Sequence, residues 1–231
     1  MPKKKLDPQV QSVYTAHVAT KAPPRRLTAR GAATRARIVA AAASLVYERG
    51  FAGTSLDDVM AATGTSKSQL YHYFADKDAL IREVIKAQLG RIIAAQEAAG
   101  LHEISSWEGL QRWCDHFVTA TRETQGAGGC PLGSLVGELA DQSEPARRVL
   151  AQCFADWQSY LSEGFEAMRD NGELAAQADP AELALTVMSA LQGGLLMAQA
   201  TRSARPLELA LNMALQHMAA YRRRPKQAGR H

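Results

Sequence analysis

Apolar residues recur at helical spacing near the start of the chain. After Thr34, the residues Ile38, Ala42 and Val46 follow one another every four positions, which is the spacing of one face of an α-helix. Thr34 is a candidate N-cap for this helix and Gly50 a candidate C-cap. The pattern therefore predicts a first helix of about four turns.

Two shorter helices are expected next. In GTSLDDVMAATG, Thr54 or Ser55 can cap the second helix, and Gly64 can end it. A third helix then begins at about Ser66 and ends near Phe74. The two are joined by a tight turn that contains glycine.

A long fourth helix begins near Lys77, with Asp76 as its cap and Leu80, Val84 and Ile85 among its apolar positions. Two short helices joined by a tight turn, with a longer helix on each side, are typical of a helix-turn-helix unit.

The third helix has two chemically different faces. Leu70 and Phe74 are four residues apart and share the side suited to packing on the neighbouring helices. The other positions are polar or aromatic: Lys67, Ser68, Gln69, Tyr71, His72 and Tyr73. Such a face suits a recognition helix, in which Lys, Gln or Ser reaches base edges in the major groove. The alternative is a surface helix whose polar residues are simply solvated.

From about Ser105 the chain shows five more helical segments and no alternating strand pattern. A glycine-rich break, QGAGGCPLG, separates the first of these segments from the second. The last two segments are apolar around much of their circumference, which is typical of buried or interface helices. Gly193 and Gly194 lie in mid-helix, where each costs about 1 kcal/mol relative to Ala. A close helix contact, at a dimer interface or within one protomer, or a kink would explain them.

Composition narrows the class of protein. The chain has 231 residues, of which 46% are hydrophobic, and its purely apolar runs are too short to cross a membrane. The basic start, MPKKKLDPQV, is not followed by an apolar signal core, so we expect a cytoplasmic protein. Three widely spaced cysteines predict neither a disulfide framework nor a zinc site, and we expect no metal and no cofactor.

Charge is unevenly distributed. Residues 1–31 hold seven Lys or Arg against one Asp, and residues 222–231 hold five, so the rest of this +4 chain carries a net charge of −7. Basic tails around an acidic body indicate affinity for a polyanion such as nucleic acid, although such tails can also be inert and solvated. We expect the arm, especially Arg25, Arg26 and Arg30, to supply much of the salt-dependent attraction to DNA.

A candidate ligand pocket involves aromatic, sulfur-containing and amide side chains of the second half. Its candidates are Trp113, His116, Phe117, Cys130, Phe154, Trp157, Met188 and Gln192. The alternative is that this stripe is ordinary core. Cys130 precedes Pro131 at a predicted helix start, where backbone N–H groups can lower the pKa of a thiol. Most free cysteines are nevertheless inert.

The stretch TRARIVAAAASLVYERGFAGTSLDDVMAATGTSKSQLYHYFADKDALIREVI resembles the DNA-binding domain of the tetracycline-repressor (TetR) family of bacterial regulators. The segment GCPLGSLVGELA is similar to the LmrA- and YxaF-like branch, and also to some electrophile-sensing regulators. The resemblance implies an all-helical homodimer that represses a palindromic operator and is released by an effector. It also implies a dimer interface in the last two helices, with Gly193, Gly194, Leu211 and Leu215 as candidates.

The resemblance also implies roles for single residues. Base edges fall to Lys67, Ser68 and Gln69, with Tyr73 as a further candidate. Phosphate contacts fall to Thr54, Ser55, Ser66, Tyr71, His72 and Lys77.

We therefore predict an all-α protein with four parts: a flexible basic arm (1–32), a helix-turn-helix DNA-binding domain (33–78), a helical effector-binding and dimerisation domain (79–222) and a basic tail (223–231). The predicted function is a DNA-binding repressor released by a small, largely apolar effector. One alternative is a redox or electrophile sensor acting through Cys130, and another is a helical protein-interaction module. No nucleophile elbow, P-loop or dinucleotide fingerprint favours an enzyme.

Overall fold

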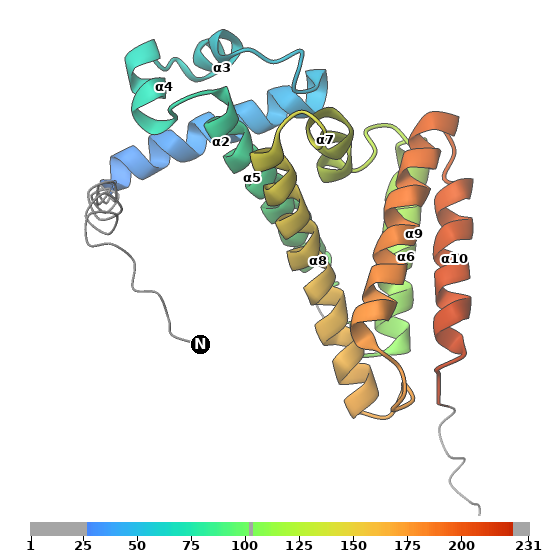
Figure 1. Ribbon diagram of the computed structural model, residues 1–231. Coiled ribbons are helices and arrows are strands. Elements are labelled where there is room, and N and C mark those ends of the chain that lie inside the picture. Colours follow the sequence, from blue (N-terminus) through green and yellow to red (C-terminus); the bar gives the residue numbers. More distant parts are fainter. Residues whose placement is uncertain (1–26, 102–103, 224–231) are drawn as a thin grey trace, which may run out of the picture. The chain divides into compact units, whose positions relative to one another are not determined.

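The computed structural model describes residues 27–101 and 104–223, and these form nine α-helices (Figure 1). The first four are α2 (Ala29–Arg49), α3 (Leu56–Thr63), α4 (Lys67–Tyr73) and α5 (Lys77–Ala98). The other five are α6 (Trp107–Glu123), α7 (Pro131–Leu139), α8 (Glu144–Asp170), α9 (Pro180–Thr201) and α10 (Arg205–Ala219). The predicted all-α class is confirmed.

The chain divides into two compact units, residues 1–35 and residues 36–231. The described part of the first unit contains the amino-terminal turns of α2, where the hydroxyl of Thr34 donates to the carbonyl of Arg30 over 3.0 Å. Thr34 is therefore an interior residue of a helix that begins at Ala29, and its prediction as N-cap is wrong. Residues 1–26 of the expected arm, with Arg25 and Arg26, and residues 224–231 of the tail lie outside the described residues.

The predicted ends of α3 are confirmed. Ser55 and Asp58 form a capping box, in which the Ser55 hydroxyl accepts the N–H of Asp58 over 3.1 Å and the Asp58 carboxylate accepts the N–H of Ser55 over 2.9 Å. The Ser55 hydroxyl also donates to the Asp58 carboxylate over 2.5 Å, and this bond together with the one from the Ser55 N–H holds the pKa of the Asp58 carboxyl below its ordinary value. Gly64 ends the helix with a φ of 61°, a left-handed conformation that suits glycine.

The next two helices also begin as expected. Ser66 caps α4, and the carboxylate of Asp76 accepts the N–H of Ala79 at the start of α5. Leu70 and Phe74 are buried at 0% and 2% exposure among the core side chains that α2, α3 and α5 contribute. The short helix α4 is thus fixed in place by two side chains four residues apart.

In the second half of the chain, α8 packs against α5 and α9, and α9 packs against α10 (Figure 1). The largest fully buried side chains here are Trp113, Trp157 and Phe165. The indole N–H of Trp113 donates to the side-chain oxygen of Gln96 over 2.6 Å, which ties α6 to α5 inside the core. Five helices in this half were predicted, and the structure confirms them.

Among the described helices, α9 is by length and composition apolar enough to cross a membrane. Its packing against both α8 and α10 gives another physical reason for the same composition, because a helix covered on two sides needs apolar residues around much of its circumference.

Candidate nucleic-acid interface and effector cavity

Helix α4 presents the polar face that its sequence predicts. Lys67, Ser68, Gln69, Tyr71 and His72 are exposed, with 46% of the surface of Tyr71 accessible. The opposite side of the helix lies in the core. A short helix with one anchored side and one side rich in hydrogen-bonding groups has the chemistry needed to read a DNA groove.

Ser66 and Gln69 also serve the helix itself. The hydroxyl of Ser66 accepts the N–H of Gln69 over 3.2 Å, and the side-chain oxygen of Gln69 accepts the N–H of Ser66 over 3.1 Å. This capping box occupies the oxygen of Gln69 and leaves its NH₂ group as a donor for a base or a phosphate.

The aromatic residues at the end of α4 contact one another. The rings of His72 and Tyr73 meet edge to face with centroids 5.0 Å apart, and Tyr73 is half-buried beside Phe74. Of the predicted base-reading residues, Tyr73 is therefore the most enclosed.

Thr54 and Ser55 are less free than predicted. Thr54 is only 3% exposed, and its hydroxyl donates to the carbonyl of Gly50 over 2.9 Å. The hydroxyl of Ser55 is exposed but belongs to the capping box with Asp58. In this conformation, neither hydroxyl is free of an internal hydrogen bond.

Lys77 is half-buried and contacts Phe51 twice. Its ammonium donates to the carbonyl of Phe51 over 2.9 Å and lies 4.0 Å from the centroid of the Phe51 ring. The side chain therefore joins the start of α5 to the turn after α2. A role at a phosphate remains a prediction.

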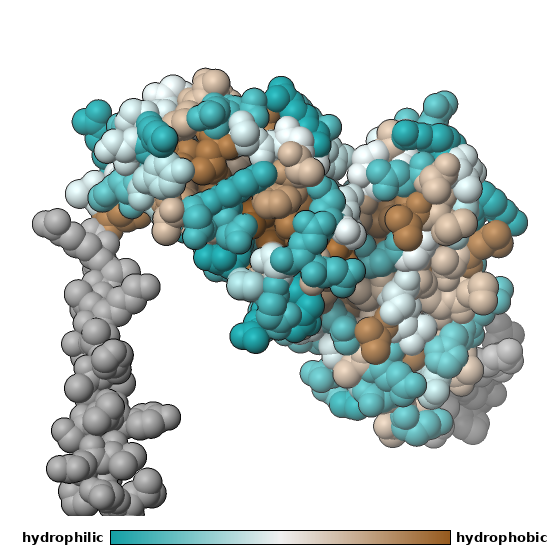
Figure 2. All heavy atoms as spheres, turned by 45° about the horizontal axis from the view of Figure 1, so that its top comes forward, coloured by the Kyte–Doolittle hydropathy of each residue, from teal (hydrophilic) through white to brown (hydrophobic). Residues whose placement is uncertain are grey.

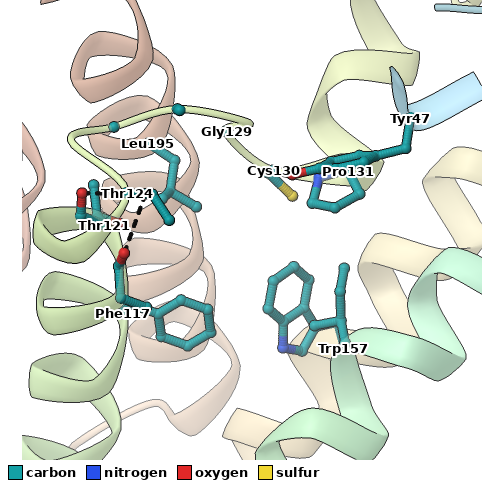
Figure 3. A pocket seen from close by; sticks show the side chains of 13 residues that line it. Tyr47, Phe117, Thr121, Thr124, Gly129, Cys130, Pro131, Trp157 and Leu195 are labelled. Carbon is teal, nitrogen blue, oxygen red and sulfur yellow. Dashed lines mark hydrogen bonds between the residues drawn. The ribbon is translucent and has the colours of Figure 1, made fainter. Parts of the chain in front are cut away.

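A cavity of about 200 Å³ lies beneath the loop between α6 and α7 (Figure 3). Three of the predicted pocket residues line it: Phe117, Cys130 and Trp157. Tyr47, from α2, also lines this cavity and was missed, because its position in the first helix gave no sign that it would lie beside residues 70 or more positions later.

A second hollow, of about 290 Å³, lies on the other side of Cys130 and takes Phe154 and Gln192. The predicted pocket residues are thus divided between two hollows. Trp113, His116 and Met188 line neither hollow. Trp113 is fully buried, and its ring centroid lies 4.7 Å from that of Phe117, whose ring His116 also contacts edge to face. The sulfur of Met188 accepts a hydrogen bond from the side-chain amide of Gln192 over 3.8 Å.

The loop over the cavity depends on glycine. Gly126 and Gly128 have φ values of 72° and 85°, which L side chains rarely adopt. A Cβ at Gly126 would overlap the carbonyl of Ala198 on α9, and one at Gly128 would overlap the hydroxyl of Tyr47. The loop is therefore held close to both α2 and α9.

Cys130 is the N-cap of α7, and its sulfur accepts the N–H of Gly133 over 3.3 Å. Burial nevertheless raises the pKa of this thiol, outweighing the bonds from Gly133, Leu132 and Gln192 that favour the thiolate. The expected lowering of the pKa is wrong for this reason. Within residues 27–101 and 104–223, no three His, Cys, Asp or Glu side chains gather as a metal-binding group.

Large apolar side chains are exposed on the last two helices. Brown and tan surface appears over this side of the molecule in Figure 2. The residues concerned are Leu185, Leu196, Met197, Leu209 and Met213, which are 46–70% exposed. Apolar surface of this extent is typical of an interaction site.

The predicted interface residues have different surroundings. Gly194 is buried, and a Cβ there would lie 2.7 Å from the Cα of Leu207 on α10. Leu211 is only 1% exposed within the protomer, and Leu215 is half-buried. Gly193 is exposed, and a Cβ added there would meet nothing within 4 Å among the described residues apart from its own turns of α9. Gly194 and Leu211 are thus intramolecular packing residues, the alternative that the sequence left open.

Comparison with known proteins gives consistent matches. The profile described as "Bacterial regulatory proteins, tetR family" matches residues 38–84, and "Tetracyclin repressor-like, C-terminal domain" matches residues 107–214. A Lactococcus lactis protein described as an HTH-type transcriptional regulator in the lacX 3' region is 32% identical over 185 residues, which are 76% of this chain and 88% of that protein.

Two further relatives carry more specific names. The regulator LmrA of Bacillus subtilis is 27% identical, covering 75% of this chain and 90% of its own length. The repressor NemR of Escherichia coli is 29% identical, covering 77% and 90%. Among solved structures, a TetR transcriptional regulator from Chloroflexus aurantiacus is 25% identical, with a TM-score of 0.69, and the match covers 86% of this chain and 100% of that one.

Proposed function

The chain belongs to the TetR family of transcriptional regulators, and from this premise we propose that it is a cytoplasmic repressor that binds a palindromic operator as a homodimer and is released by a small effector. Members of the family are DNA-binding regulators rather than enzymes. The operator, the dimer, the effector and the direction of control are the proposed parts.

The exposed face of α4 carries the DNA-reading part of the proposal. Lys67 and the NH₂ group of Gln69 are suited to acceptors on base edges, and the Tyr71 hydroxyl is suited to a phosphate. Leu70, buried on the other side, fixes the angle at which the helix is presented. The buried face of α4 thus positions the helix, and the opposite, exposed face carries the groups proposed to contact DNA.

The exposed apolar side chains of α9 and α10 support the dimer. Leu196, Met197 and Met213 are each more than half exposed in the protomer, and covering them with the same face of a second copy would remove this apolar surface from water. Gly193 has open space on its side of α9 among the described residues and would allow close approach of the partner helix. A two-fold dimer in turn favours a palindromic operator.

The cavity beneath the glycine-rich loop supports the effector site. It is lined mainly by apolar residues and includes Tyr47 of α2, the helix whose Arg37 donates to the carbonyl of Thr63 at the end of α3. A ligand shifts an equilibrium only by its difference in affinity for the two states, so release from the operator requires that the ligand bind the non-binding arrangement more tightly. Contact with Tyr47 on α2 is the route by which we propose that the ligand does so.

The test is a gel-shift titration with DNA taken from immediately upstream of the gene's own start. We expect the full chain to retard a fragment with an inverted repeat and not one in which half of the repeat is scrambled. A Lys67→Ala variant should bind more weakly, whereas Arg112→Ala, which removes an exposed charge from α6, should bind like the parent protein. Equal retardation of both fragments would refute sequence-specific repression.

The thiol-sensor alternative rests on the position of Cys130 between the two hollows. Its buried thiol with a raised pKa counts against rapid reaction. The test is alkylation by N-ethylmaleimide in a chain whose other cysteines are replaced by serine. Fast modification of Cys130 together with loss of DNA binding would favour this alternative, and unchanged DNA binding after complete modification would exclude it.

A further inference from the structure

The carbonyl of Thr63 accepts a hydrogen bond from the guanidinium of Arg37, which joins the end of α3 to α2. The last four carbonyls of a helix have no partner within that helix, and the negative end of the helix dipole attracts a cation. Helix α3 has no basic residue in its own last turn. Arg37 therefore supplies both a donor and a positive charge to the end of α3 from a different helix.

The turn that follows Thr63 leads directly into the DNA-reading helix α4. Gly64 has a φ of 61°, and the two residues beside it, Thr63 and Thr65, are buried at 6% and 5% exposure. The hydroxyl of Thr65 donates to that of Thr63 over 2.6 Å, and the Thr63 hydroxyl donates to the carbonyl of Val59 over 2.7 Å. A chain of hydrogen bonds thus fixes the turn, and Arg37 links this chain to α2.

The direction of α4 depends on this turn because the helix is short. Its seven residues make about two helical turns, and Leu70 and Phe74 anchor it along one line of its surface. Two anchors on one line resist sliding but allow rotation about that line. A fixed position for Ser66, which caps the helix, removes this freedom. The exposed side chains of Lys67 and Gln69 then point in one direction.

Arg37 has two possible uses in a DNA-binding protein. The residue is exposed as a whole, and an exposed arginine of such a protein can contact a phosphate. Here one terminal nitrogen of the guanidinium donates to Thr63. Because Arg stays protonated, this bond is charge-assisted and belongs to the stronger kind of hydrogen bond. Reaching out to a phosphate would break the bond, so the two uses compete.

We propose that Arg37 is a positioning residue for base recognition, which sets the direction of α4 through Thr63 and does not contact DNA. This inference rests on the proposed sequence-specific repressor and deepens it. Loss of Arg37 should reduce discrimination between DNA sequences and leave the attraction to DNA of any sequence unchanged. A phosphate contact predicts the reverse, because it adds affinity for every sequence.

The full-length protein tests this with a duplex that the parent protein selects from a random-sequence library and with a scrambled duplex of the same length. Arg37→Met keeps an unbranched stem and removes the charged donor. We expect the ratio of the two affinities to fall about tenfold, the contribution of a charge-assisted hydrogen bond. The slope of log K against log salt should stay the same for both duplexes. A ratio within twofold of that of the parent protein, or a slope reduced by about 1, would overturn the proposal.

Two variants control for the loss of charge and of the donor. Arg112→Met removes an exposed arginine from α6 and should change neither the ratio nor the slope. Arg37→Lys keeps a cation with N–H donors on a flexible stem, so it should recover part of the ratio that Arg37→Met loses.

Hydrogen exchange of the protein without DNA gives a measurement that is independent of any operator. In Arg37→Met, the amides of Gly64 and Thr65, which both donate within the turn, should exchange about tenfold faster. The amide of Asp58 at the other end of α3, which Ser55 holds, should keep its rate. Unchanged exchange at the turn, or equal acceleration at Asp58, would overturn the proposal, because Arg37 would then not act on the turn.

The selection and the variant give separate results. If the library yields no preferred sequence, the proposed repressor fails, and exchange at the turn alone decides whether Arg37 positions it. If a sequence is selected but Arg37→Met discriminates as well as the parent protein, the repressor stands and the inference on Arg37 fails.

Discussion

The carboxylate of Glu138 accepts a hydrogen bond from the backbone N–H of Phe51, with 2.7 Å between oxygen and nitrogen. Glu138 lies near the end of α7, and the residues at the start of this helix, Cys130 and Pro131, line the cavity. Phe51 lies in the turn between α2 and α3, and its carbonyl accepts from Lys77 of α5. The backbone of Phe51 is therefore held by side chains of two helices, Glu138 of α7 and Lys77 of α5.

Replacing Glu138 should loosen this turn and weaken the response to ligand. Glu138→Ala removes a charged acceptor from a partly buried N–H, and we expect a loss of about 1 kcal/mol in the free energy of unfolding. Hydrogen exchange at Phe51 should accelerate. The ratio of operator affinities measured without and with a small apolar ligand of the cavity should fall about fivefold, the size of a coupling of about 1 kcal/mol.

Two variants control for this. Glu138→Gln retains an acceptor oxygen and should keep most of the coupling, and Asp141→Ala removes an exposed carboxylate just beyond α7 and should change none of the three quantities. Unchanged exchange at Phe51 in Glu138→Ala would mean that the hydrogen bond does not hold the turn.

Lys77 distinguishes an internal role from contact with DNA. Lys77→Met keeps the length of the side chain and removes both the hydrogen bond and the cation–π contact with Phe51, so the free energy of unfolding should fall by about 1–2 kcal/mol. Because the ammonium is engaged within the protein, the slope of log K against log salt for operator binding should stay the same. A slope reduced by about 1 would instead establish the phosphate contact that the sequence predicts.

The exposed residues of α4 should divide by the kind of defect they cause. Lys67→Ala should change the preference at one base pair by about 1–3 kcal/mol. Tyr71→Phe should instead lower the affinity for every operator variant by the same factor, with no change in base preference. Gln69→Glu removes the side-chain NH₂ group but keeps an oxygen that can accept the N–H of Ser66. Any change in base preference is therefore not caused by loss of the helix cap. Anisotropy titrations with a set of single-base operator variants measure all three.

Local rules predicted the DNA-reading part well because its determinants are close in sequence. Ser55 with Asp58, and Ser66 with Gln69, form their capping boxes over three residues, and Leu70 with Phe74 defines a face over four. The start of α2 was misplaced because a threonine that can cap a helix can also bond back to a carbonyl inside one, as Thr34 does with Arg30.

The cavity could be predicted only in part because it joins distant segments. Phe117 and Trp157 stand out as aromatic residues, but Tyr47 enters the cavity through the packing of α2, which no local pattern shows. The lack of a hydrogen-bond partner for the indole N–H of Trp157 among the described residues is likewise a property of the folded protein. For Cys130, the helix start was predicted correctly, but the degree of burial, which decides the direction of its pKa, depends on segments distant in the chain.

The neighbouring glycines of α9 should have opposite effects on the protomer. A Cβ at Gly194 would meet the backbone of Leu207, so Gly194→Ala should force α9 and α10 apart and lower the free energy of unfolding by about 1–3 kcal/mol. The Cβ of Gly193→Ala meets no described atom within 4 Å apart from its own turns of α9, so this change should raise helix stability by about 0.5–1 kcal/mol. Thermal and urea unfolding of the two variants beside the parent protein measure both effects, and a Gly194→Ala protein as stable as the parent would contradict the close packing of α9 on α10.

The proposed dimer makes Gly193 sensitive to a larger residue. If the exposed face of α9 contacts a second copy, Gly193→Leu should leave the protomer folded but shift sedimentation towards monomer, while Gly193→Ala has a smaller effect. Circular dichroism distinguishes this from the unfolding expected of Gly194 variants. A Gly193→Leu protein that remains fully dimeric at micromolar concentration would place the interface elsewhere on α9 and α10. Leu196→Glu and Met213→Glu would then locate it. A carboxylate buried without a partner in an apolar interface strongly destabilises the dimer.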